Sequence, residues 1–592
     1  MPLSLREDGR MRARSWVVTV AAGLVLADAS IVTLALPELL RALDTTVEGV
    51  AAVIAVYTGV LALALLPAAR VTGRLGAARS GALGFGLFAL ASVGCAVADT
   101  LTWLLVARAI QACAGAFGLV AAFELIRGGT QAGRRHWLGA AVLASAVGPA
   151  LGGALTQAFD WRAIFVVQIP IAATGALAAL RDRPEPASTP LVEDEHEPQR
   201  ARIADAVALA LVSAALTAVL FGLVLLLIAG WAVEPLAAAA TVTVLPLAAL
   251  AGARVHAPPH VRALAGCLLV GGGVLALAWL PSASVAWTFA PQALAGVGMG
   301  MALPAFAGEL LPERTTHEAA RLLTIRHVGI ALVLVALAPL IARRLDVVTE
   351  RAQEQGVALV LDAKLPPQDK LTLAPALLGG VEAERPRAGL RAALADNGGG
   401  YEGEERTTYD ALAQRADDVL VGAVGDAFRI AFVIAGGLAL LAAAALALTA
   451  RAANADRAGG AEDARAPGGS PGCARPEATG PARSRAWALS FVLAATAGLP
   501  LAYAALHASQ EPMQVAIQDP CKDRELPGTG GIAGFLQDRA LEALDTAACR
   551  YGSSREELVL ALADAQAAKR YEHDHGVDPR SVSSVLGNLI NP

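Results

Sequence analysis

Long blocks of apolar residues alternate with short polar stretches along most of the chain. A helix needs about 20 apolar residues to cross a bilayer, and many of the blocks approach that length. The predicted membrane spans form a group of six, a second group of six and a single last span. Their approximate ranges are 16–37, 48–68, 81–98, 102–124, 137–158 and 163–180, then 204–229, 235–253, 263–281, 286–308, 325–342 and 428–449, and finally 486–507.

The composition also indicates a polytopic membrane protein. Apolar residues make up 55% of the 592 residues and charged residues only 17%, with a mean hydropathy of +0.53. Soluble domains usually carry about 25% charged residues, so a soluble enzyme is excluded as the main body. The net charge of −5 excludes a dedicated nucleic-acid-binding protein.

Arginine residues are concentrated in every second short loop between the predicted spans. The loops after the second, fourth and eighth spans contain them, whereas the alternate loops hold little beyond Arg41 and Arg162. By the positive-inside rule the N-terminus is cytoplasmic, and thirteen spans then place the C-terminus outside. We expect a multi-pass protein of a bacterial plasma (inner) membrane.

The spans and the polar stretches divide the chain into six parts. The linker after the second group of spans is rich in Gly, Pro and Ala, a composition typical of disorder. Stretches 345–361 and 407–427 have the spacing of amphipathic helices. The predicted parts are an N-terminal six-helix bundle at 15–180, a cytoplasmic inter-bundle linker at 181–203, a C-terminal six-helix bundle at 204–450 with an extracytoplasmic insert at 343–427, a disordered cytoplasmic linker at 451–485, a thirteenth transmembrane helix at 486–507, and an extracytoplasmic helical tail at 508–592.

The six cysteines are distributed unevenly over this predicted topology. Three lie in predicted spans, and Cys473 lies in a cytoplasmic linker. Only Cys521 and Cys549 face the oxidising side, where disulfides form and persist, so we predict that they are bonded. Closing this loop stabilises the tail by about 3–4 kcal/mol in the chain-entropy description. Two unpaired thiols in a helical tail are the alternative.

Two short sequence matches relate the first six spans to the second six. Gln111-Ala-Cys-Ala-Gly115 in the fourth span matches Gln292-Ala-Leu-Ala-Gly296 in the tenth, and Ala69-Arg-Val71 matches Ala253-Arg-Val255. The offsets are 181 and 184 residues, and each pair falls on equivalent helices. The matches indicate duplicated six-helix halves. Parallel halves around a midplane site describe the major facilitator fold.

Motifs in the first half carry a resemblance to one branch of that superfamily. They are Asp28-Ala-Ser-Ile-Val-Thr-Leu-Ala-Leu-Pro37, Arg108-Ala-Ile-Gln111, Gly148-Pro149-Ala-Leu-Gly152-Gly153, and Asp160-Trp-Arg-Ala-Ile-Phe165 with Gln168-Ile-Pro170. Together they resemble the helix signatures of the multidrug:proton antiporters, over about residues 15–342 and 428–450. The resemblance implies an all-α fold of two six-helix bundles that rock against each other. This chain adds one C-terminal transmembrane helix and small helical extracytoplasmic segments.

The loop between the second and third spans departs from the family pattern. The family carries an Asp after Gly-x-Leu-Ala, whereas Gly73-Arg74-Leu75-Gly76-Ala-Ala-Arg79 is shortened and holds no acidic residue. In the family that Asp helps to latch the cytoplasmic side between states. We assign Gly73, Arg74 and Arg79 to a cytoplasmic gate loop that lacks this acid.

Asp28 and Arg108 are charged residues within predicted spans. A charge near the bilayer centre costs about 2.5–3.5 kcal/mol, so intramembrane acids are functional candidates. Desolvation makes a carboxylate easier to protonate, while an arginine keeps its proton. In the resembled fold both helices line the cavity, so the two charges are expected to face each other. They act either as a proton-coupling pair or as a fixed ion pair that only packs the helices.

Candidate substrate contacts lie in the fourth and tenth spans. We assign Gln111, Gln292, Thr288, Phe289 and Met299 to a substrate cavity. The second half has no ionisable residue at its predicted membrane centre, which favours a largely apolar substrate surface there. Contacts with lipid or with neighbouring helices are the alternative for the aromatic and methionine side chains.

The fifth span contains small residues around a proline. Glycine lets helices approach closely, and proline bends a helix. We assign Gly148, Pro149, Gly152 and Gly153 to a conformational hinge that packs against a helix of the second half. Ordinary small-residue packing is the alternative.

The sequence predicts a transporter and not an enzyme. It contains no Walker-type phosphate loop and no evident catalytic triad, and Glu572-His-Asp-His575 is interpreted as a solvated polar segment rather than a metal site. No cofactor is expected. We expect export of hydrophobic or amphipathic small molecules in exchange for protons. The alternatives are export of a lipid-like or cell-envelope metabolite with handoff to the extracytoplasmic segments, and a non-transporting scaffold whose tail binds a protein partner.

Overall fold

The structure is a computed structural model in which the described residues form helices and no β-strand. They fall into two compact units, which are described separately. The first contains Met1–Ile228, Val233–Ala342 and Arg429–His507, and the second contains Ala229–Ala232, Arg343–Phe428 and Ala508–Pro592. The described residues are 2–127, 130–181, 199–307, 309–311, 315–366, 370, 373, 386–463, 482–510, 515, 517–522, 524, 526–528 and 531–580.

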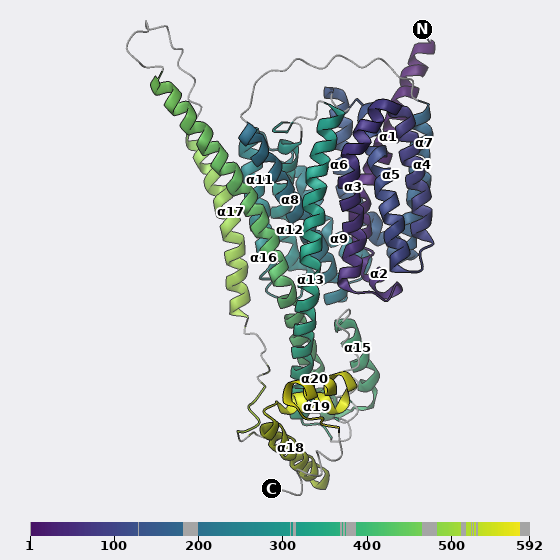
Figure 1. Cartoon of the computed structure of the whole chain (residues 1–592). Helices are drawn as coiled ribbons and strands as arrows, with labels where there is room; N and C mark the ends of the chain where they lie inside the picture. The colour runs from purple at the N-terminus through teal and green to yellow at the C-terminus, as the bar shows by residue number, and fades with distance from the viewer. Residues whose placement is uncertain are drawn as a thin grey trace. The chain divides into compact units, whose positions relative to one another are not determined.

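The first unit is a bundle of long apolar helices (Figure 1). Among the described residues, 12 helical segments are long and apolar enough to cross a membrane, and α6 covers the remaining predicted span. The helices of this unit are α1 (Pro2–Thr33), α2 (Leu36–Ala42), α3 (Val47–Leu75), α4 (Ala77–Ala96), α5 (Leu101–Leu125), α6 (Gln131–Ala158), α7 (Arg162–Leu180), α8 (Gln199–Leu225), α9 (Pro235–Val242), α10 (Val244–Gly252), α11 (Pro259–Leu277), α12 (Val285–Phe306), and parts of α13 (Thr316–Asp362), α16 (Gly403–Asp463) and α17 (Ala482–Ser509).

Threonine side chains cap the first turns of three of these helices. Thr46, Thr100 and Thr130 precede α3, α5 and α6, and each hydroxyl accepts a hydrogen bond from the backbone N–H three residues later. An α-helix leaves its first four N–H groups without partners inside the helix, and a cap satisfies one of them. These polar residues therefore fix where three apolar helices begin.

Several helices have boundaries that the apolar blocks did not predict. α13 begins at Thr316, nine residues before the predicted span, and continues to Asp362, while α16 continues through the predicted end of its span to Asp463. The predicted amphipathic helices at 345–361 and 407–427 are therefore continuations of membrane helices. Hydropathy marks the apolar part of a helix, whereas the helix itself extends through polar residues that favour helical backbone.

The prediction that residues 451–485 form a disordered linker is wrong for both ends of this range. Residues up to Asp463 belong to α16 and residues from Ala482 belong to α17, because alanine is the best helix former and is frequent there. Residues 464–481 lie outside the described part of the chain, as do Cys473 and residues 182–198 of the predicted linker at 181–203.

The eighth predicted span is broken into α9 and α10 at Thr243. Pro246, three residues later, lacks the N–H that would bond the carbonyl of Val242, and its ring crowds the same carbonyl. The seventh span ends in a π-helical turn at Leu226–Gly230. Both irregularities lie in the C-terminal half, where the sequence predicted plain helices.

Close glycine contacts between helices recur at equivalent places in the two halves. Gly84 of α4 lies against the backbone of Gly118 of α5, and Gly266 of α11 lies against the backbone of Gly298 of α12. Neither contact leaves room for a Cβ atom. The second pair follows the first by 182 and 180 residues, close to the offsets of the sequence matches, which supports a duplication.

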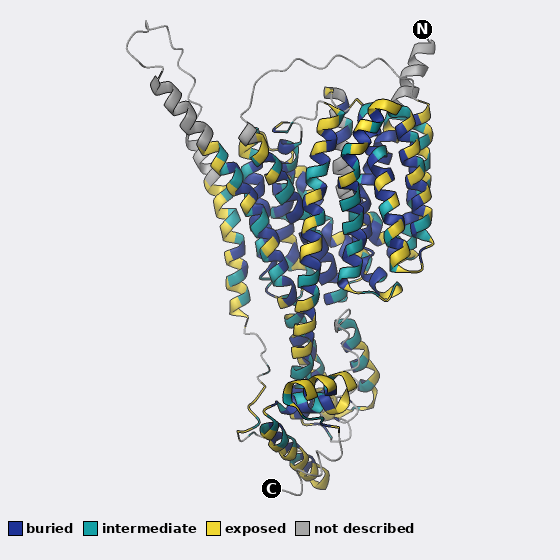
Figure 2. Ribbon diagram, viewed as in Figure 1, coloured by how far each residue is buried: buried dark blue, intermediate teal, exposed yellow. Residues whose placement is uncertain are grey.

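The helix α17 is attached to the side of the C-terminal half. Thr496 of α17 packs on Gly272 of α11, and the hydroxyl of Tyr503 donates to the carbonyl of Trp287 at 2.8 Å. Only 6% of its apolar window, Ser490–Ser509, is buried, and Figure 2 shows exposed positions along it. Most of its surface is therefore available to lipid.

The second unit combines the insert with the tail. It contains the end of α13, the start of α16, α15 (Pro386–Asn397), α18 (Gly531–Tyr551), α19 (Arg555–Ala563) and α20 (Ala565–His575). The predicted disulfide between Cys521 and Cys549 is present, with Cα atoms 5.0 Å apart. Arg524 and Arg555 of the tail pair with Asp362 of the insert at 2.9 and 2.8 Å. Covalent and ionic contacts thus hold this unit together.

Candidate functional site

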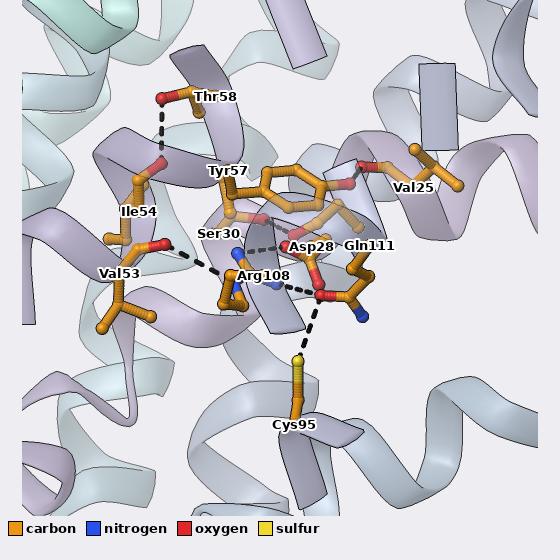
Figure 3. Close-up of polar contacts among 12 residues, drawn as sticks. Val25, Asp28, Ser30, Val53, Ile54, Tyr57, Thr58, Cys95, Arg108 and Gln111 are labelled. Atoms are coloured by element: carbon orange, nitrogen blue, oxygen red, sulfur yellow. Dashed lines mark hydrogen bonds and ion pairs between the residues drawn. The ribbon is translucent and has the colours of Figure 1, made fainter. Parts of the chain in front are cut away.

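A polar cluster lies inside the N-terminal half, with an ion pair at its centre (Figure 3). The Oδ2 atom of Asp28 on α1 is 2.6 Å from Nη2 of Arg108 on α5, and both side chains are 0% exposed. The two charges therefore face each other as the sequence predicted. A buried pair of this kind offsets the desolvation of each ion by their mutual attraction.

The guanidinium of Arg108 has contacts on several sides. Its Nη1 donates to Oε1 of Gln111 at 2.6 Å and its Nε donates to the carbonyl of Val53 at 3.4 Å. It also lies over the ring of Tyr57, 4.1 Å from the centroid, a cation–π geometry. The hydroxyl of Tyr57 donates to the carbonyl of Val25 at 2.9 Å. Helices α1, α3 and α5 are thus joined around one charge.

Two glutamines and a serine complete the cluster. Gln168 of α7 donates from Nε2 to Oδ1 of Asp28 at 2.8 Å. Gln111 donates from Nε2 to Oε1 of Gln168 and to Oγ of Ser92 on α4, both at 2.8 Å. The Ser92 hydroxyl donates to the carbonyl of Phe88 at 2.8 Å. Five helices therefore contribute to one continuous hydrogen-bond network.

The sequence identified the ion pair but missed some of its partners. Gln168 entered only as part of a motif, and Ser92 and Tyr57 were not considered. The available signal was a polar residue within an apolar helix, since buried polar groups nearly always have partners. That signal does not say which helices meet.

Gln111, which was assigned to the substrate cavity, is part of the ion-pair cluster in the structure. Its side chain is 0% exposed, and its amide is used by Arg108, Gln168 and Ser92. A motif places the residue on the fourth helix but does not fix the direction of its side chain. In this conformation Gln111 belongs to the ion-pair cluster.

The other proposed cavity residues lie on α12 and are not equivalent. Gln292 donates from Nε2 to the hydroxyl of Thr288 at 3.0 Å, and both side chains are buried. Met299 is half-buried and follows Thr288 by about three turns, so it lies on the same face of the helix. Phe289 points to a different side and is 43% exposed. The structure thus groups three of the four residues.

The second half contains buried ionisable residues that the sequence assignment did not include. His327 of α13 is 6% exposed, and its Nδ1 lies 2.7 Å from the carbonyl of Leu323. Asp205 of α8 is 1% exposed. His327 lies three turns inside α13, which begins at Thr316. The interior of this half is more polar than predicted.

The glycines of α6 contact two different helices. A methyl group at Gly148 would overlap the side chain of Ser30, and one at Gly152 would overlap the backbone of Ile31, both on α1. A methyl at Gly153 would overlap Ala239 of α9. Pro149 lies within α6. Of the three glycines of the predicted hinge, Gly153 is therefore the one whose added methyl group would meet the second half.

The predicted gate loop is reduced to a single residue. Gly73 and Arg74 belong to the last turns of α3, and Arg79 belongs to α4. Gly76 joins the two helices with φ +85° and ψ 148°, a conformation that glycine adopts at no steric cost. Arg74 and Arg79 are exposed and form no ion pair with any residue that the structure describes.

A contact between the halves occurs at the end of α5. The hydroxyl of Thr316, at the start of α13, donates to Oε1 of Glu124 at 2.9 Å. Nearby along α13, the hydroxyl of Thr324 donates to the carbonyl of Ala62 on α3 at 3.3 Å. These bonds connect the first half to the second. Neither of them involves the loop at 73–79, which has no acidic residue.

Comparison with known proteins identifies relatives of this chain. The sequence model of the Major Facilitator Superfamily matches residues 18–339. The chain is 30% identical over 173 residues to the methylenomycin A resistance protein of Streptomyces coelicolor, covering 28% of this chain and 36% of that protein. It is equally similar to the drug efflux pump JefA of Mycobacterium tuberculosis, covering 28% and 34%. The chain spans about a third of the length of the curated relatives it matches.

The fold is similar to that of a solved transporter structure. A bacterial homolog of the human lysosomal transporter Spinster, crystallised in an inward-facing and occupied conformation, superposes with a TM-score of 0.51 at 16% identity. The match covers 74% of this chain and 96% of that chain. Identity at this level supports a shared fold only.

Proposed function

The chain belongs to the major facilitator superfamily of transporters, and from this premise we propose that it exports hydrophobic or amphipathic small molecules in exchange for protons. The proposed cycle is alternating access, in which residues 15–180 move against residues 204–450. The proposed orientation has a cytoplasmic N-terminus and an extracytoplasmic C-terminus. The relatives named for drug resistance and drug efflux support the substrate class.

The observation that carries the proton coupling is the buried ion pair of Asp28 and Arg108. Adding a proton to Asp28 neutralises the only carboxylate bonded to Arg108 among the described residues. An arginine cannot follow by losing its own proton, so the protein must rearrange around an uncompensated charge. A proton that enters through a potential of 100 mV supplies about 2.3 kcal/mol for such a change.

Both members of this pair are 0% exposed, so protonation belongs to a different conformation. In the proposed cycle Asp28 binds a proton when the outer side is open and releases it when the inner side is open. The conformation described above, with donors on both carboxylate oxygens, corresponds to the deprotonated step.

The test replaces Asp28 in inverted membrane vesicles, whose cytoplasmic side faces outward. It measures the proton-gradient-driven uptake of a hydrophobic cationic dye, ethidium, into these vesicles, which corresponds to export from the cell. Asp28→Asn is expected to reduce gradient-dependent transport to the level of vesicles without the protein. Asp44→Asn is the matched control, because Asp44 is an exposed acid with φ 45°, and asparagine tolerates positive φ. It should transport as the wild type does.

Folding must be monitored, since removing one member of a buried pair is destabilising. Size-exclusion profiles of the purified variants provide that check. Undiminished gradient-dependent transport by a monodisperse Asp28→Asn protein would remove Asp28 from the coupling mechanism.

A further inference from the structure

The two ends of the ion-pair cluster, Arg108 and Asp28, determine the direction of every hydrogen bond between them. Arginine can only donate, so the atom of Gln111 that faces Nη1 of Arg108 must be its oxygen. Nε2 of Gln111 then donates to the oxygen of Gln168, and Nε2 of Gln168 donates to Asp28. An ionised carboxylate can only accept. The four side chains therefore form one directed chain that fits a charged Asp28.

A proton on Asp28 conflicts with one of its two donors. At Oδ2 it would face Nη2 of Arg108 at 2.6 Å, a donor that has no acceptor atom to offer. At Oδ1 it would face the amide of Gln168 at 2.8 Å. An amide carries a donor and an acceptor of nearly equal size and can exchange them by rotating half a turn. Oδ1 is the oxygen whose partner is able to change from donor to acceptor.

We propose that Gln168 and Gln111 form an amide relay that inverts when Asp28 is protonated and thereby removes from Arg108 its acceptor at Gln111. The proposal rests on the proton coupling described above and names how the proton acts on the protein. The only covalent change is a proton transfer in an open state: an O–H bond of a hydronium ion breaks, an O–H bond forms at Oδ1 and a water molecule is left.

The inverted chain provides partners for Asp28, Gln168 and the oxygen of Gln111, but not for Arg108 or the Nε2 of Gln111. The new Asp28 hydroxyl donates to the oxygen of Gln168, whose Nε2 then donates to the oxygen of Gln111. The hydroxyl of Ser92, which now donates to Phe88, is placed to donate to that same oxygen. The Nε2 of Gln111 comes to face Nη1 of Arg108, and two donors repel each other. Arg108 is left with the carbonyl of Val53 and a neutral acid.

Near Asp28, no other described side chain would bind the proton in its place. The titratable or charged side chains in electrostatic contact with Asp28 are Tyr57 of α3, Cys95 of α4 and Arg108 of α5. Neither the phenol nor the thiol is a base that competes with a carboxylate for the proton. The glycines of α6 that lie against α1 are Gly148 and Gly152, and His136 of α6 contacts Trp16, twelve residues before Asp28 on α1.

The relay would link a proton on α1 to the position of α5. Arg108 is fully buried, so losing its ionic partner and its acceptor together leaves a charge without compensation. Its guanidinium must then move toward other acceptors or water, and it carries α5 relative to α1, α3 and α7. If Asp28 were protonated without the relay, Arg108 would lose only its ionic partner and would keep its hydrogen bond to Gln111.

The experiment is infrared difference spectroscopy of the full-length protein in detergent, titrated from alkaline to acidic buffer with and without ¹³C-labelled glutamine side-chain amides. In the wild type, the carboxyl band that is absent from Asp28→Asn should appear together with a change in the glutamine amide bands. In Gln168→Met the carboxyl band should remain and the amide change should be lost. In Gln111→Met part of the amide change, that of Gln168, should remain.

Gln292→Met is the matched control, because Gln292 is a buried glutamine at the repeat-related position of α12 and is outside the cluster. It should leave the Asp28-dependent spectrum unchanged. A carboxyl band without any amide change, or an amide change that survives in full in Gln168→Met, would overturn the relay. Neither result depends on transport, so the relay can fail while Asp28-dependent efflux stands.

Discussion

Arg108 is the residue whose charge organises the N-terminal interior. It has no acceptor atom and no accessible neutral form, so each neighbour must offer it an oxygen or a ring face. Asp28, Gln111, Val53 and Tyr57 all do so. The directions of the remaining hydrogen bonds follow from this requirement, which is why an ion pair and two amides form a single unit.

This dependence predicts how stability responds to removing the charges. Arg108→Ala leaves the Asp28 carboxylate buried without its ionic partner and should lower the free energy of unfolding by about 3–5 kcal/mol. The double variant Asp28→Asn/Arg108→Gln removes both charges and keeps side chains of similar size, so it should be more stable than Arg108→Ala. Thermal unfolding of the purified proteins, followed by loss of the monodisperse size-exclusion peak, compares them. A double variant no more stable than Arg108→Ala would show that charge compensation contributes little here.

The sequence predicted the ion pair but not its amide partners, for a physical reason. Two charges in apolar spans are conspicuous because their insertion is costly. A glutamine such as Gln168 costs less, and its importance depends on the rotation of its helix. Lipid and protein interiors are equally apolar, so the apolar pattern of α7 does not reveal which face meets Asp28. The contact becomes visible only when the helices are packed.

At the scale of elements, glycines determine which helices approach closely. The run Gly271-Gly272-Gly273 in α11 contacts three helices in turn, with Leu440 of α16, Thr496 of α17 and Ala295 of α12 as neighbours. Three successive residues of a helix point in directions about 100° apart, so one short run can serve three sides. This run provides the surface to which the additional helix α17 is attached.

The contact between α6 and α9 joins a glycine of the predicted hinge, Gly153, to the second half. Gly153→Val should separate these helices, because its side chain would occupy the position of Ala239. Gln157, one turn later, accepts a hydrogen bond from the backbone N–H of Leu236 at 2.8 Å and belongs to the contact. With a reporter cysteine at the neighbouring Thr156, which is 6% exposed, Gly153→Val should label several-fold faster with an impermeant thiol reagent and should transport more slowly.

Gly86→Val is the control for this experiment, because Gly86 of α4 has no neighbour within 4 Å of an added Cβ atom. Its labelling and transport should match those of the reporter alone. Equal labelling of the Gly153→Val and Gly86→Val proteins would mean that the α6–α9 contact does not control access at this end.

The sequence predicted where the membrane helices lie better than it predicted the residues at which they begin and end. The apolar blocks located each described helix that is long and apolar enough to cross a membrane, because crossing a bilayer requires a minimum apolar length. They did not locate the start of α13 or the break at Thr243, since helix ends depend on caps and prolines more than on hydropathy. His327 therefore lies three turns inside α13 and not at its beginning, and it is 6% exposed.

At the scale of the whole molecule, the chain adds a second folded unit to a transporter bundle. The insert and the tail are separated by 80 residues of sequence, yet they share a buried ion network within that unit. Arg555 is 0% exposed and pairs with Asp362 and Glu556 at 2.8 and 3.2 Å, and Arg524 pairs with the same two acids. The sequence located both segments and their disulfide, but not this network, because long-range pairing leaves no local pattern.

Lys370 lies beside this network and provides a pH test of the second unit. Burial lowers the pKa of Lys370 from 10.5 to about 8, with nearby Arg555 acting in the same direction and Asp362 opposing it. Its Nζ donates to the carbonyl of Leu361 at 2.7 Å, a bond that a neutral amine retains. Below about pH 8 the lysine is charged in the folded and the unfolded chain. In this pH range the folded unit buries a charged amine, and the whole cost of that burial is subtracted from the free energy of unfolding.

Between about pH 8 and pH 10.5 the unfolded chain binds a proton that the folded unit has released, so the free energy of unfolding rises with pH. The stability of the wild type relative to Lys370→Met should therefore increase across this window and level off above it. Pulse proteolysis of the full-length protein in rising urea measures the second unit. Lys364→Met, which alters an exposed lysine of the same segment, should track the wild type at every pH. A constant difference between the wild type and Lys370→Met would mean that this lysine keeps its ordinary affinity for protons in the folded unit.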